Sequence, residues 1–522
     1  MLKYLIKRVL YGMVCIVLVV AIVMVMIYSL LDRKQIFAAD GNYGKNQSNQ
    51  KITYMHTKWE EYGYLDYVTY ADYLNDEVAA GRLSQEARDD VAAIGRTPDK
   101  DSPEVAEYVQ KFTDEYQSKG YTVLRYDADV KGRKLAKGGQ QILFATKDRP
   151  LLERAWEYFS GIVTIDNIHY VQEDVGERGI SFTWRDPLYG GEKLSPAIIG
   201  NGTYHKYLLY ADGQFPFIHQ NIATITLGTS YSVSMGVDVF KTMTRSQGSY
   251  VLSPITYPTG LSESSADDLH TATYLAGSRE TNPVNAARFT DDYTGVETVR
   301  GGLSKMGYSF VIGIIATLLA YFIGVPVGIL MALKKDKAAD KIGNFYIIFI
   351  IAVPSLAYIF LVKAIGGKAG LPTTFDMEST SKLMFLLPIV SLAMTSIANL
   401  MKWVRRYMID QMNSDYVKFA RSGGLTEGEI FTKHILKNAI IPVVHGIPGS
   451  FLFAMTGAII TERVYVVPGA GNLLTEAINK YDNGVIVGVT LFYAILSVLS
   501  IILGDILMSI VDPRISFSSK DR

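Results

Sequence analysis

The chain has 522 residues, of which 49% are hydrophobic, and its 51 basic residues balance its 51 acidic ones. A neutral chain gives no sign of a nucleic-acid partner. The single cysteine, Cys15, excludes a disulfide within the chain and a cysteine-based metal cluster. Residues 33–300 are polar and charged, whereas most of 301–511 is apolar. This division indicates a membrane protein that carries one large polar insert.

Six segments are long and apolar enough to cross a membrane. A helix rises about 1.5 Å per residue, so a hydrocarbon core of about 30 Å needs about 20 apolar residues. The segments that meet this requirement are 9–31, 307–333, 342–362, 383–401, 439–461 and 485–511. The first follows Lys3, Lys7 and Arg8, as a secretory signal would, but its uncharged run is too long and no small-residue cleavage site follows it. We therefore expect a retained anchor.

Basic residues in the short loops predict the orientation of the chain. They gather in 334–341 and 402–437, on the side that the N-terminus shares, and are sparse on the opposite side. Because basic loops stay in the cytoplasm, both termini are expected to be cytoplasmic. The expected parts are a cytoplasmic N-terminus with the first transmembrane helix (1–32), an extracellular α+β insert (33–300), a core with transmembrane helices 2–6 (301–511) and a cytoplasmic tail (512–522).

The predicted fold class is an all-α polytopic membrane domain, interrupted by the α+β insert. Within the insert, the patterns predict helices over 102–119 and 151–159 and strands over 121–126, 142–146 and 180–184. Its abundant tyrosines suit contact with a ligand or, as we prefer, ordinary packing; examples are Tyr62, Tyr64, Tyr67, Tyr70 and Tyr73. No nucleophile–base pair or metal-ligand spacing occurs, so the chain is not expected to be an enzyme.

The loop 413–442 carries the most informative pattern in the chain. Ser414 or Asp415 is expected to cap a short helix that Gly423 and Gly424 end, and Thr426 begins a capping box for a second helix. Spacing places Tyr416, Phe419 and Ala420 on one face of the first helix. A rigid helix with exposed aromatic residues suits insertion into a groove on another protein. The alternative is a helix that lies on lipid headgroups.

This loop resembles the EAA loop of ABC importer permeases. The form D-Y-V-x-x-A-R-x-x-G-L, followed by His, Asn-Ala and Ile-Pro, is similar to the oligopeptide, dipeptide and nickel branch; Gly423 departs from it, since relatives usually carry a larger residue there. The resemblance implies a helix that docks on the ATPase. The residues to which it gives a coupling role are Asp415, Tyr416, Phe419, Ala420, Arg421, Gly424, Leu425, His434, Asn438 and Pro442.

Other stretches resemble the same family. The family motif after the fifth expected span is matched by Glu462, Pro468, Gly469 and Gly471. The stretches 227–230, 316–328 and 512–515 are similar to further family segments. Together they imply the type I importer fold and the B-type permease of Gram-positive oligopeptide systems, in the cell membrane of a bacterium.

The resemblance also implies partners. The chain has no G-x-x-x-x-G-K-[ST] loop, so ATP and Mg²⁺ are expected on separate subunits and no cofactor or metal on this chain. The implied partners are two cytoplasmic ATPases, a second related permease, an extracellular lipid-anchored peptide-binding protein and membrane lipid.

Ionisable residues inside membrane spans usually face protein or water, which makes His445 and Asp505 candidates for lining the transport pathway. Pro326, Pro354, Pro388, Pro442 and Pro448 are candidates for kinks that shape the pathway. Three alternatives stay open. The substrate could be nickel or another small solute, or the chain could be a receptor with an extracellular ligand domain or a secondary transporter.

Overall fold

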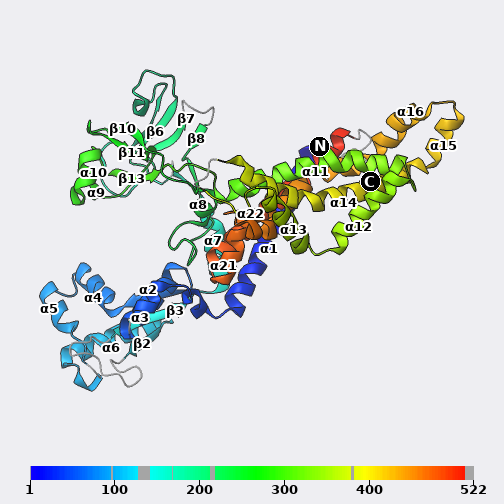
Figure 1. The fold of residues 1–522 in the computed structure, drawn as a ribbon. Coiled ribbons are helices and arrows are strands. Elements are labelled where there is room, and N and C mark those ends of the chain that lie inside the picture. The colour runs from blue at the N-terminus through cyan, green and yellow to red at the C-terminus, as the bar shows by residue number, and fades with distance from the viewer. Residues whose placement is uncertain are drawn as a thin grey trace.

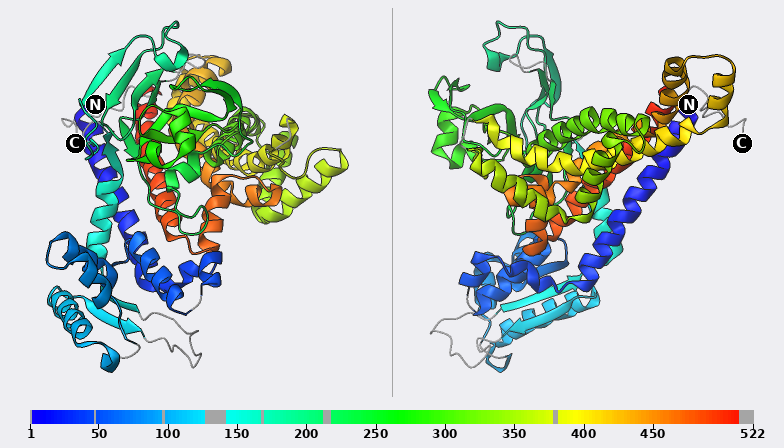
Figure 2. Two further views of the ribbon diagram at one scale, coloured as in Figure 1. Left: turned by 90° about the vertical axis from the view of Figure 1, so that its left-hand side faces the viewer. Right: turned by 45° about the vertical axis from the view of Figure 1, so that its right-hand side comes forward.

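The computed structural model describes residues 2–46, 48–95, 98–126, 142–166, 169–211, 218–377 and 381–511. The chain forms an elongated helical bundle with two lobes at one end and a helical hairpin at the other (Figure 1). The helix α1 (Leu2–Leu30) begins at the hairpin end and finishes beside the first lobe (Figure 2).

Four long helices form the bundle. They are α1, α11 (Lys305–Leu333), α14 (Leu386–Met412) and α22 (Asn483–Val511), and each is long and apolar enough to cross a membrane. They confirm the helices expected over 9–31, 307–333, 383–401 and 485–511. Pro326 lies inside α11 without breaking it, so this proline is not a hinge in the helix.

The segment 342–362, expected as one span, is broken. It consists of α12 (Ala338–Ala352) and α13 (Ser355–Lys368), whose axes differ by 110°. Val353 between them is extended, because proline at 354 disfavours the helical conformation in the residue before it and has no N–H to donate. The kink expected at Pro354 is therefore confirmed, and it is a sharp bend between two helices.

The segment 439–461 is divided into short helices, and the residues between them, Ile440, Gly446 and Ala458, keep right-handed helical backbone angles. The helices are α17 (Lys437–Ala439), α18 (Ile441–His445), α19 (Ile447–Gly457), α20 (Ile459–Tyr465) and, further along, α21 (Ala470–Asn479). Pro442 and Pro448 lie in the first turns of α18 and α19, where a missing N–H costs least. In the described ranges the candidate spans therefore number four, or five if α12 and α13 count as one, and the six-span count stays an expectation.

The first lobe is an α+β unit built on an antiparallel sheet of order β1-β3-β2. Its elements are α2 (Gly41–Lys45), α3 (Ser48–Glu61), β1 (Leu65–Thr69), α4 (Tyr70–Ala79), α5 (Gln85–Val91), α6 (Pro103–Ser118), β2 (Thr122–Tyr126) and β3 (Ile142–Asp148). All five tyrosines singled out from the sequence are buried in this lobe. The interpretation as ordinary packing is confirmed.

The second lobe contains three small antiparallel sheets, of orders β5-β6-β7-β8, β10-β11 and β12-β13. Its strands are β5 (Gly179–Thr183), β6 (Ala197–Asn201), β7 (Tyr207–Ala211), β8 (Ile218–Gln220), β10 (Ser253–Thr256), β11 (Ser262–Ser265), β12 (Asp267–Tyr274) and β13 (Tyr293–Thr298). Its helices are α9 (Ser278–Thr281) and α10 (Pro283–Arg288), whereas α8 (Val239–Thr244) packs on the bundle against α11 and α22. The strands and helices predicted within the insert are confirmed, and they are divided between two lobes and the segment that connects them.

A helix and a ribbon connect the two lobes beside the bundle. The helix is α7 (Leu151–Gly161), and the ribbon pairs β4 (Val163–Ile165) with β9 (Ala223–Ile225). After β9, residues 226–233, which we call the strap, run over the start of α22.

A buried ionic pair in the second lobe predicts a pH-dependent stability. His270 Nε2 lies 2.8 Å from Asp186 Oδ2, and both side chains are buried. Burial alone would lower the pKa of His270, but the hydrogen bonds and charges of Asp186 and Asp268 raise the pKa to about 9. An unfolded histidine titrates near about 6.5, so this stabilisation is complete below that pH and is lost as pH rises through about 9.

We therefore expect the thermal unfolding midpoint to be higher at pH 6 than at pH 9.5, with on the order of 3 kcal/mol of unfolding free energy at stake. The measurement is thermal unfolding of the purified chain in detergent across this range. The His270→Gln variant should show a flatter profile. If that variant falls as steeply as the parent protein, other groups cause the pH dependence.

Candidate coupling site

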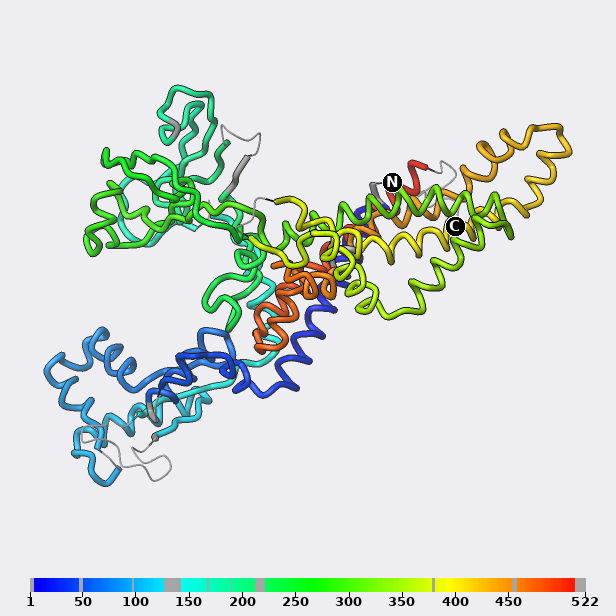
Figure 3. Tube along the Cα trace, viewed as in Figure 1, coloured from blue at the N-terminus to red at the C-terminus, as the bar shows by residue number. Residues whose placement is uncertain are grey.

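The helix α15 (Asp415–Ser422) lies at the end of the bundle farthest from the lobes (Figures 1 and 3). Ser414 occupies the N-cap position, but its hydroxyl donates to the carbonyl of Gln411 at 2.6 Å and does not cap the helix. Gly424 has φ +80° and supplies the left-handed residue after the helix, whereas Gly423 has φ −76°. Only Gly424 therefore requires glycine, and a larger residue fits the backbone at 423.

The expected capping box begins the second arm of the hairpin. The Thr426 hydroxyl accepts from the Glu429 N–H, and Glu429 Oε2 accepts from the Thr426 N–H at 3.2 Å. The helix α16 (Glu427–Glu429) then continues as a π-helical segment, Ile430–Leu436. An ion pair of 2.7 Å between Arg421 and Glu427 joins the two arms.

The expected apolar face of α15 divides between the interior and the surface. Val417 is fully buried in a cluster with Met408 and Ile430. Phe419, by contrast, is 76% exposed, and it is the most exposed aromatic side chain on this helix.

Tyr416 serves mainly as a brace. Its hydroxyl donates to Gln411 Oε1 and accepts from Asn438 Nδ2 at 3.0 Å, and the carbonyl of His434 lies 3.3 Å away. The structure thus brings Tyr416, His434 and Asn438 together between the two arms of the hairpin, and the Tyr416 side chain stays 36% exposed. Three other residues with a predicted coupling role are exposed, namely Asp415, Arg421 and Leu425. Ala420 packs inward, against the buried cluster. Pro442 lies apart from them, at the start of α18 and on the wall of a cavity in the bundle.

The motif after the fifth expected span forms a buried joint. The Glu462 side chain accepts from the Ser309 hydroxyl on α11 at 2.5 Å and from the Asn472 N–H on α21 at 3.1 Å. A side chain at Gly469 would overlap the Glu462 carboxyl group, with a Cβ only 2.3 Å from it. Pro468 and Gly471 lie in the same turn. The motif therefore holds α20 against α21 and α11, and its partner Ser309 was not recognised from the sequence.

The two candidates for lining the pathway face each other. His445 Nε2 lies 3.6 Å from Asp505 Oδ1, while Asp505 Oδ2 accepts from the Tyr4 hydroxyl at 3.0 Å and pairs with Arg8 at 3.2 Å. Asp505 thus has a basic partner on α1. Tyr4 and Arg8 were not recognised from the sequence.

A separate cavity of about 370 Å³ opens between α11, α14 and the α18–α19 region. Its polar lining comes from Thr317, Tyr321, Ser396, Asn399, Trp403, Tyr407 and Ser450. A hydrogen bond of 3.0 Å joins the hydroxyls of Tyr321 and Ser450 across it. His445 and Asp505 do not line this cavity.

A second buried carboxylate ties the strap to the bundle. Asp482, just before α22, is fully buried and accepts from the Ser230 hydroxyl at 2.6 Å and from the backbone N–H groups of Tyr231, Ser232 and Val233 at 2.8–2.9 Å. The sequence pointed to 227–230 but not to Asp482. An aspartate directly before a predicted helix is an N-cap signal, and it could have pointed to Asp482. In the structure, Asp482 Oδ1 does accept from the Val485 N–H at 3.2 Å.

The base of the bundle near the hairpin is held by a buried ion pair. Arg405 on α14 donates two hydrogen bonds, of 2.6 and 2.8 Å, to the two carboxyl oxygens of Asp340 on α12. Asp340 is only 2% exposed. Such a fork geometry is typical of strong arginine–carboxylate pairing.

Comparisons with known proteins agree with the family resemblance of the loop 413–442. The family described as "Binding-protein-dependent transport system inner membrane component" matches residues 324–517. The oligopeptide transport system permease protein AmiC of Streptococcus pneumoniae is 32% identical over 99% of this chain and 99% of its own length. The dipeptide permease DppB of Bacillus subtilis is 29% identical over 41% of this chain and 68% of its own.

AmiC therefore matches the insert as well as the core, whereas DppB matches less than half of the chain. The family segment 512–515 lies outside the described residues. The resemblance inferred from 413–442 is confirmed: the chain belongs to the family of membrane permease components of binding-protein-dependent ABC transport systems, in its oligopeptide permease branch.

Proposed function

We propose that this chain is the permease subunit of an ATP-driven importer of oligopeptides and forms half of its translocation pathway. The support for the substrate class is the similarity to AmiC over nearly the whole of both chains, since AmiC is named an oligopeptide permease. Nickel or another small solute is the alternative substrate class within the branch.

The proposed topology places 1–32 as a cytoplasmic end with the first span, 33–300 outside the cell, 301–511 in the membrane and 512–522 in the cytoplasm. The bundle supports this topology, because the basic hairpin and the start of α1 lie at one end of it and both lobes lie at the other (Figure 2). The chain itself is proposed to be non-catalytic, with ATP and Mg²⁺ held by two partner ATPases. The other proposed partners are a second permease and an extracellular, lipid-anchored peptide-binding protein, in the membrane of a Gram-positive bacterium.

The observation that carries the coupling role is the exposed Phe419 on a braced hairpin. The buried Val417, the Tyr416–Asn438 hydrogen bond and the Arg421–Glu427 ion pair hold α15 in one position relative to the bundle. A helix held in this way can pass a push from a partner to α17 and α18 as a rigid body. We propose that Phe419 enters a groove on the ATPase when the complex assembles.

The cavity beside Tyr321 and Trp403 is the proposed contribution of this chain to the pathway. Its polar lining comes from three helices, as expected for a surface that alternately meets substrate and water. Pro442, at the start of α18, lies on its wall, so a displacement of the hairpin reaches the cavity through α17 and α18.

Replacing Phe419 with alanine is expected to reduce ATP-dependent uptake of labelled peptides at least ten-fold. The physical reason is that a buried aromatic anchor commonly contributes about 2 kcal/mol or more to an interface. The measurements are peptide uptake in cells and co-purification of the ATPase subunits with the permease, both at equal expression.

Phe345→Ala is the matched control, because Phe345 on α12 is 72% exposed but lies outside the hairpin. It should leave uptake and co-purification unchanged. Full uptake by the Phe419 variant, with the ATPases still bound, would contradict the docking role. Uptake of nickel but not of peptides by the parent protein would refute the substrate class.

A further inference from the structure

The helix α7, although part of the polar insert, packs lengthwise against α1. Its residues Ala155, Tyr158 and Ile162 contact a buried cluster that includes Val20 and Met24 of α1. Its Arg154 guanidinium lies 3.7 Å from the ring centre of Tyr28 and 4.2 Å from that of Tyr64.

The contacts show that α7 runs antiparallel to α1 and descends alongside the bundle (Figure 2). Arg154 lies level with Tyr28, whereas Tyr158, one turn later, shares a cavity wall with Met24. At a rise of about 1.5 Å per residue, Met24 lies about 10 Å inside the end of the apolar run at Leu31. The second half of α7 therefore lies at a depth that the bilayer occupies.

The strap gives an independent estimate of the same depth. Its Thr226 N–H donates to the carbonyl of Ile162 at 2.9 Å. The next residue, Leu227, approaches α22 so closely that a Cβ at Gly488 would lie 2.6 Å from its carbonyl oxygen. Gly488 is about 7 Å along α22 from its start at Asn483. The turn from α7 into β4 is thus the part of the connection between the lobes that lies farthest along the bundle toward the hairpin end.

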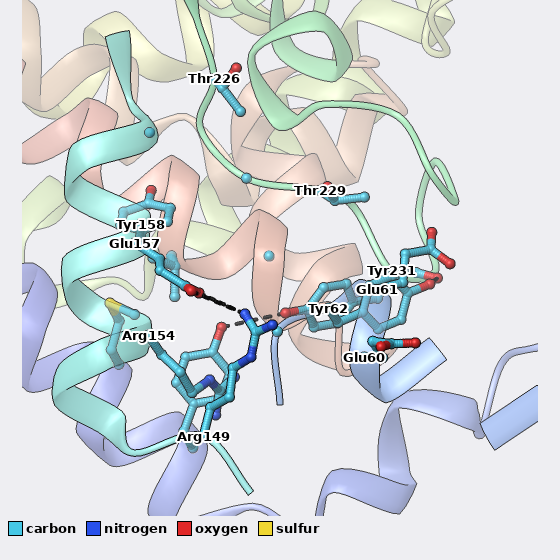
Figure 4. A pocket seen from close by; sticks show the side chains of 17 residues that line it. Glu60, Glu61, Tyr62, Arg149, Arg154, Glu157, Tyr158, Thr226, Thr229 and Tyr231 are labelled. Atoms are coloured by element: carbon cyan, nitrogen blue, oxygen red, sulfur yellow. Dashed lines mark hydrogen bonds and ion pairs between the residues drawn. The ribbon is translucent and has the colours of Figure 1, made fainter. Parts of the chain in front are cut away.

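Two of the three charged residues of α7 face protein. Arg154 and Glu157 line a cavity of about 350 Å³ between α7, the strap and the first lobe, together with Tyr158 (Figure 4). Glu157 pairs there with Arg149 at 3.0 Å. The third, Glu153, is exposed in the first turn of the helix, at the end nearest the lobes.

The opposite face of α7 is apolar and uncovered. Leu152 and Trp156, four residues apart, are 86% and 74% exposed, and Val163 and Ile225 of the ribbon are also exposed. Neither 158–165 nor 222–237 contains a charged residue. The exposed side chains of the neighbouring α1 are apolar as well, for example Val25 and Met26 near its lobe-side end.

We propose that α7 and the β4–β9 ribbon lie within the lobe-side leaflet of the bilayer, with Leu152 and Trp156 in contact with lipid. We assign lipid to this face because α7 packs beside α1, whose exposed side chains are apolar, and lies at the depth of its apolar run. Tryptophan near the end of an apolar run is typical of the membrane interface. The insert then contacts the membrane through α7 and the ribbon as well as through α1. This inference does not depend on the substrate or on the ATPase contact.

Trp156 itself provides the test, since the chain has only four tryptophans. The full chain is placed in lipid nanodiscs in two single-tryptophan forms. One keeps Trp156 and the other keeps Trp184, which is 65% exposed on the second lobe. Lipids brominated near the headgroup end of the acyl chain should reduce Trp156 emission at least two-fold and leave Trp184 unchanged. Aqueous acrylamide should do the reverse.

Equal quenching of both tryptophans by acrylamide, without a bromolipid effect, would overturn the proposal in favour of solvent exposure. Protection of Trp156 from both quenchers would overturn it in favour of a protein partner. If the multiple tryptophan replacements fail to fold, Leu152→Cys in a Cys15→Ser background carries a spin label instead. Greater accessibility of that label to oxygen than to a water-soluble nickel complex supports the proposal, and the opposite order refutes it.

Discussion

Asp482→Ala is expected to destabilise the folded chain by at least about 3 kcal/mol and to release the strap from α22. The Asp482 carboxylate accepts from one hydroxyl and four backbone N–H groups, and it is fully buried. Each buried donor left without an acceptor costs about 1–3 kcal/mol. Close packing at Gly484, where a Cβ would lie 1.9 Å from the Thr229 carbonyl oxygen, leaves little room for replacement water.

The measurements are thermal unfolding in detergent and the rate of proteolysis between 226 and 237. Glu476→Ala is the matched control, because Glu476 makes only a partly exposed i,i+4 ion pair with Lys480, which is worth about 0.3–0.5 kcal/mol. The stability of Asp482→Asn should lie between those of Asp482→Ala and the control, since the amide oxygen of asparagine remains an acceptor. A stability of Asp482→Ala equal to that of the control would contradict the role of this carboxylate.

Arg405→Gln is expected to destabilise the chain by about 3–5 kcal/mol, because it leaves the buried Asp340 charge without its partner. Asp340 retains only an amide from Asn344 at 3.0 Å and the Asp336 N–H at 2.9 Å. The two residues join α12 to α14 near the hairpin, so loss of the pair should also reduce peptide uptake. Thermal unfolding and uptake at equal expression measure the two effects.

The double variant Asp340→Asn with Arg405→Gln removes both charges and should recover most of the lost stability. Arg406→Gln serves as the control for charge alone, since Arg406 is exposed and lies 4.0 Å from an equally exposed Asp410. If the double variant is no more stable than Arg405→Gln, the pair does not act as an electrostatic unit.

Signals that depend on near neighbours in sequence were sufficient to predict the hairpin. The left-handed Gly424 and the capping box from Thr426 to Glu429 involve contacts within a few residues. The same holds for Ser102, whose hydroxyl accepts from the Val105 N–H at 3.2 Å as a helix cap.

The broken segment 342–362 shows the limit of hydropathy as a guide. Hydropathy counts apolar residues and takes no account of backbone hydrogen bonds, so it does not reveal that this segment divides into two helices. The prolines were visible, but their effect depends on the surrounding structure: Pro326 lies inside a continuous helix and Pro354 precedes a sharp bend. A single sequence does not distinguish these two cases.

Contacts between distant residues were the least predictable part of the site. Glu462 and Asp505 were recognised, but their partners Ser309 and Arg8 lie far away in the sequence. Tyr416 was expected on the docking face, yet its hydroxyl is engaged by Asn438. Periodicity places a residue on a face of a helix but does not say which side chain on that face finds an internal partner.

The attachment of the strap to α22 makes the lobes an extension of that helix. Its far end meets α1 through Asp505 and Arg8, and its flank contacts α18, which follows the hairpin. A tilt of α22 is therefore expected to displace both the lobes at one end of the bundle and the start of α1 at the other end. Coupling free energy between two sites is reciprocal. In the importer proposed above, a partner whose binding to the lobes tilts α22 is therefore expected to change the affinity of the hairpin for the ATPases, and ATPase binding is expected to change that partner's affinity by the same factor.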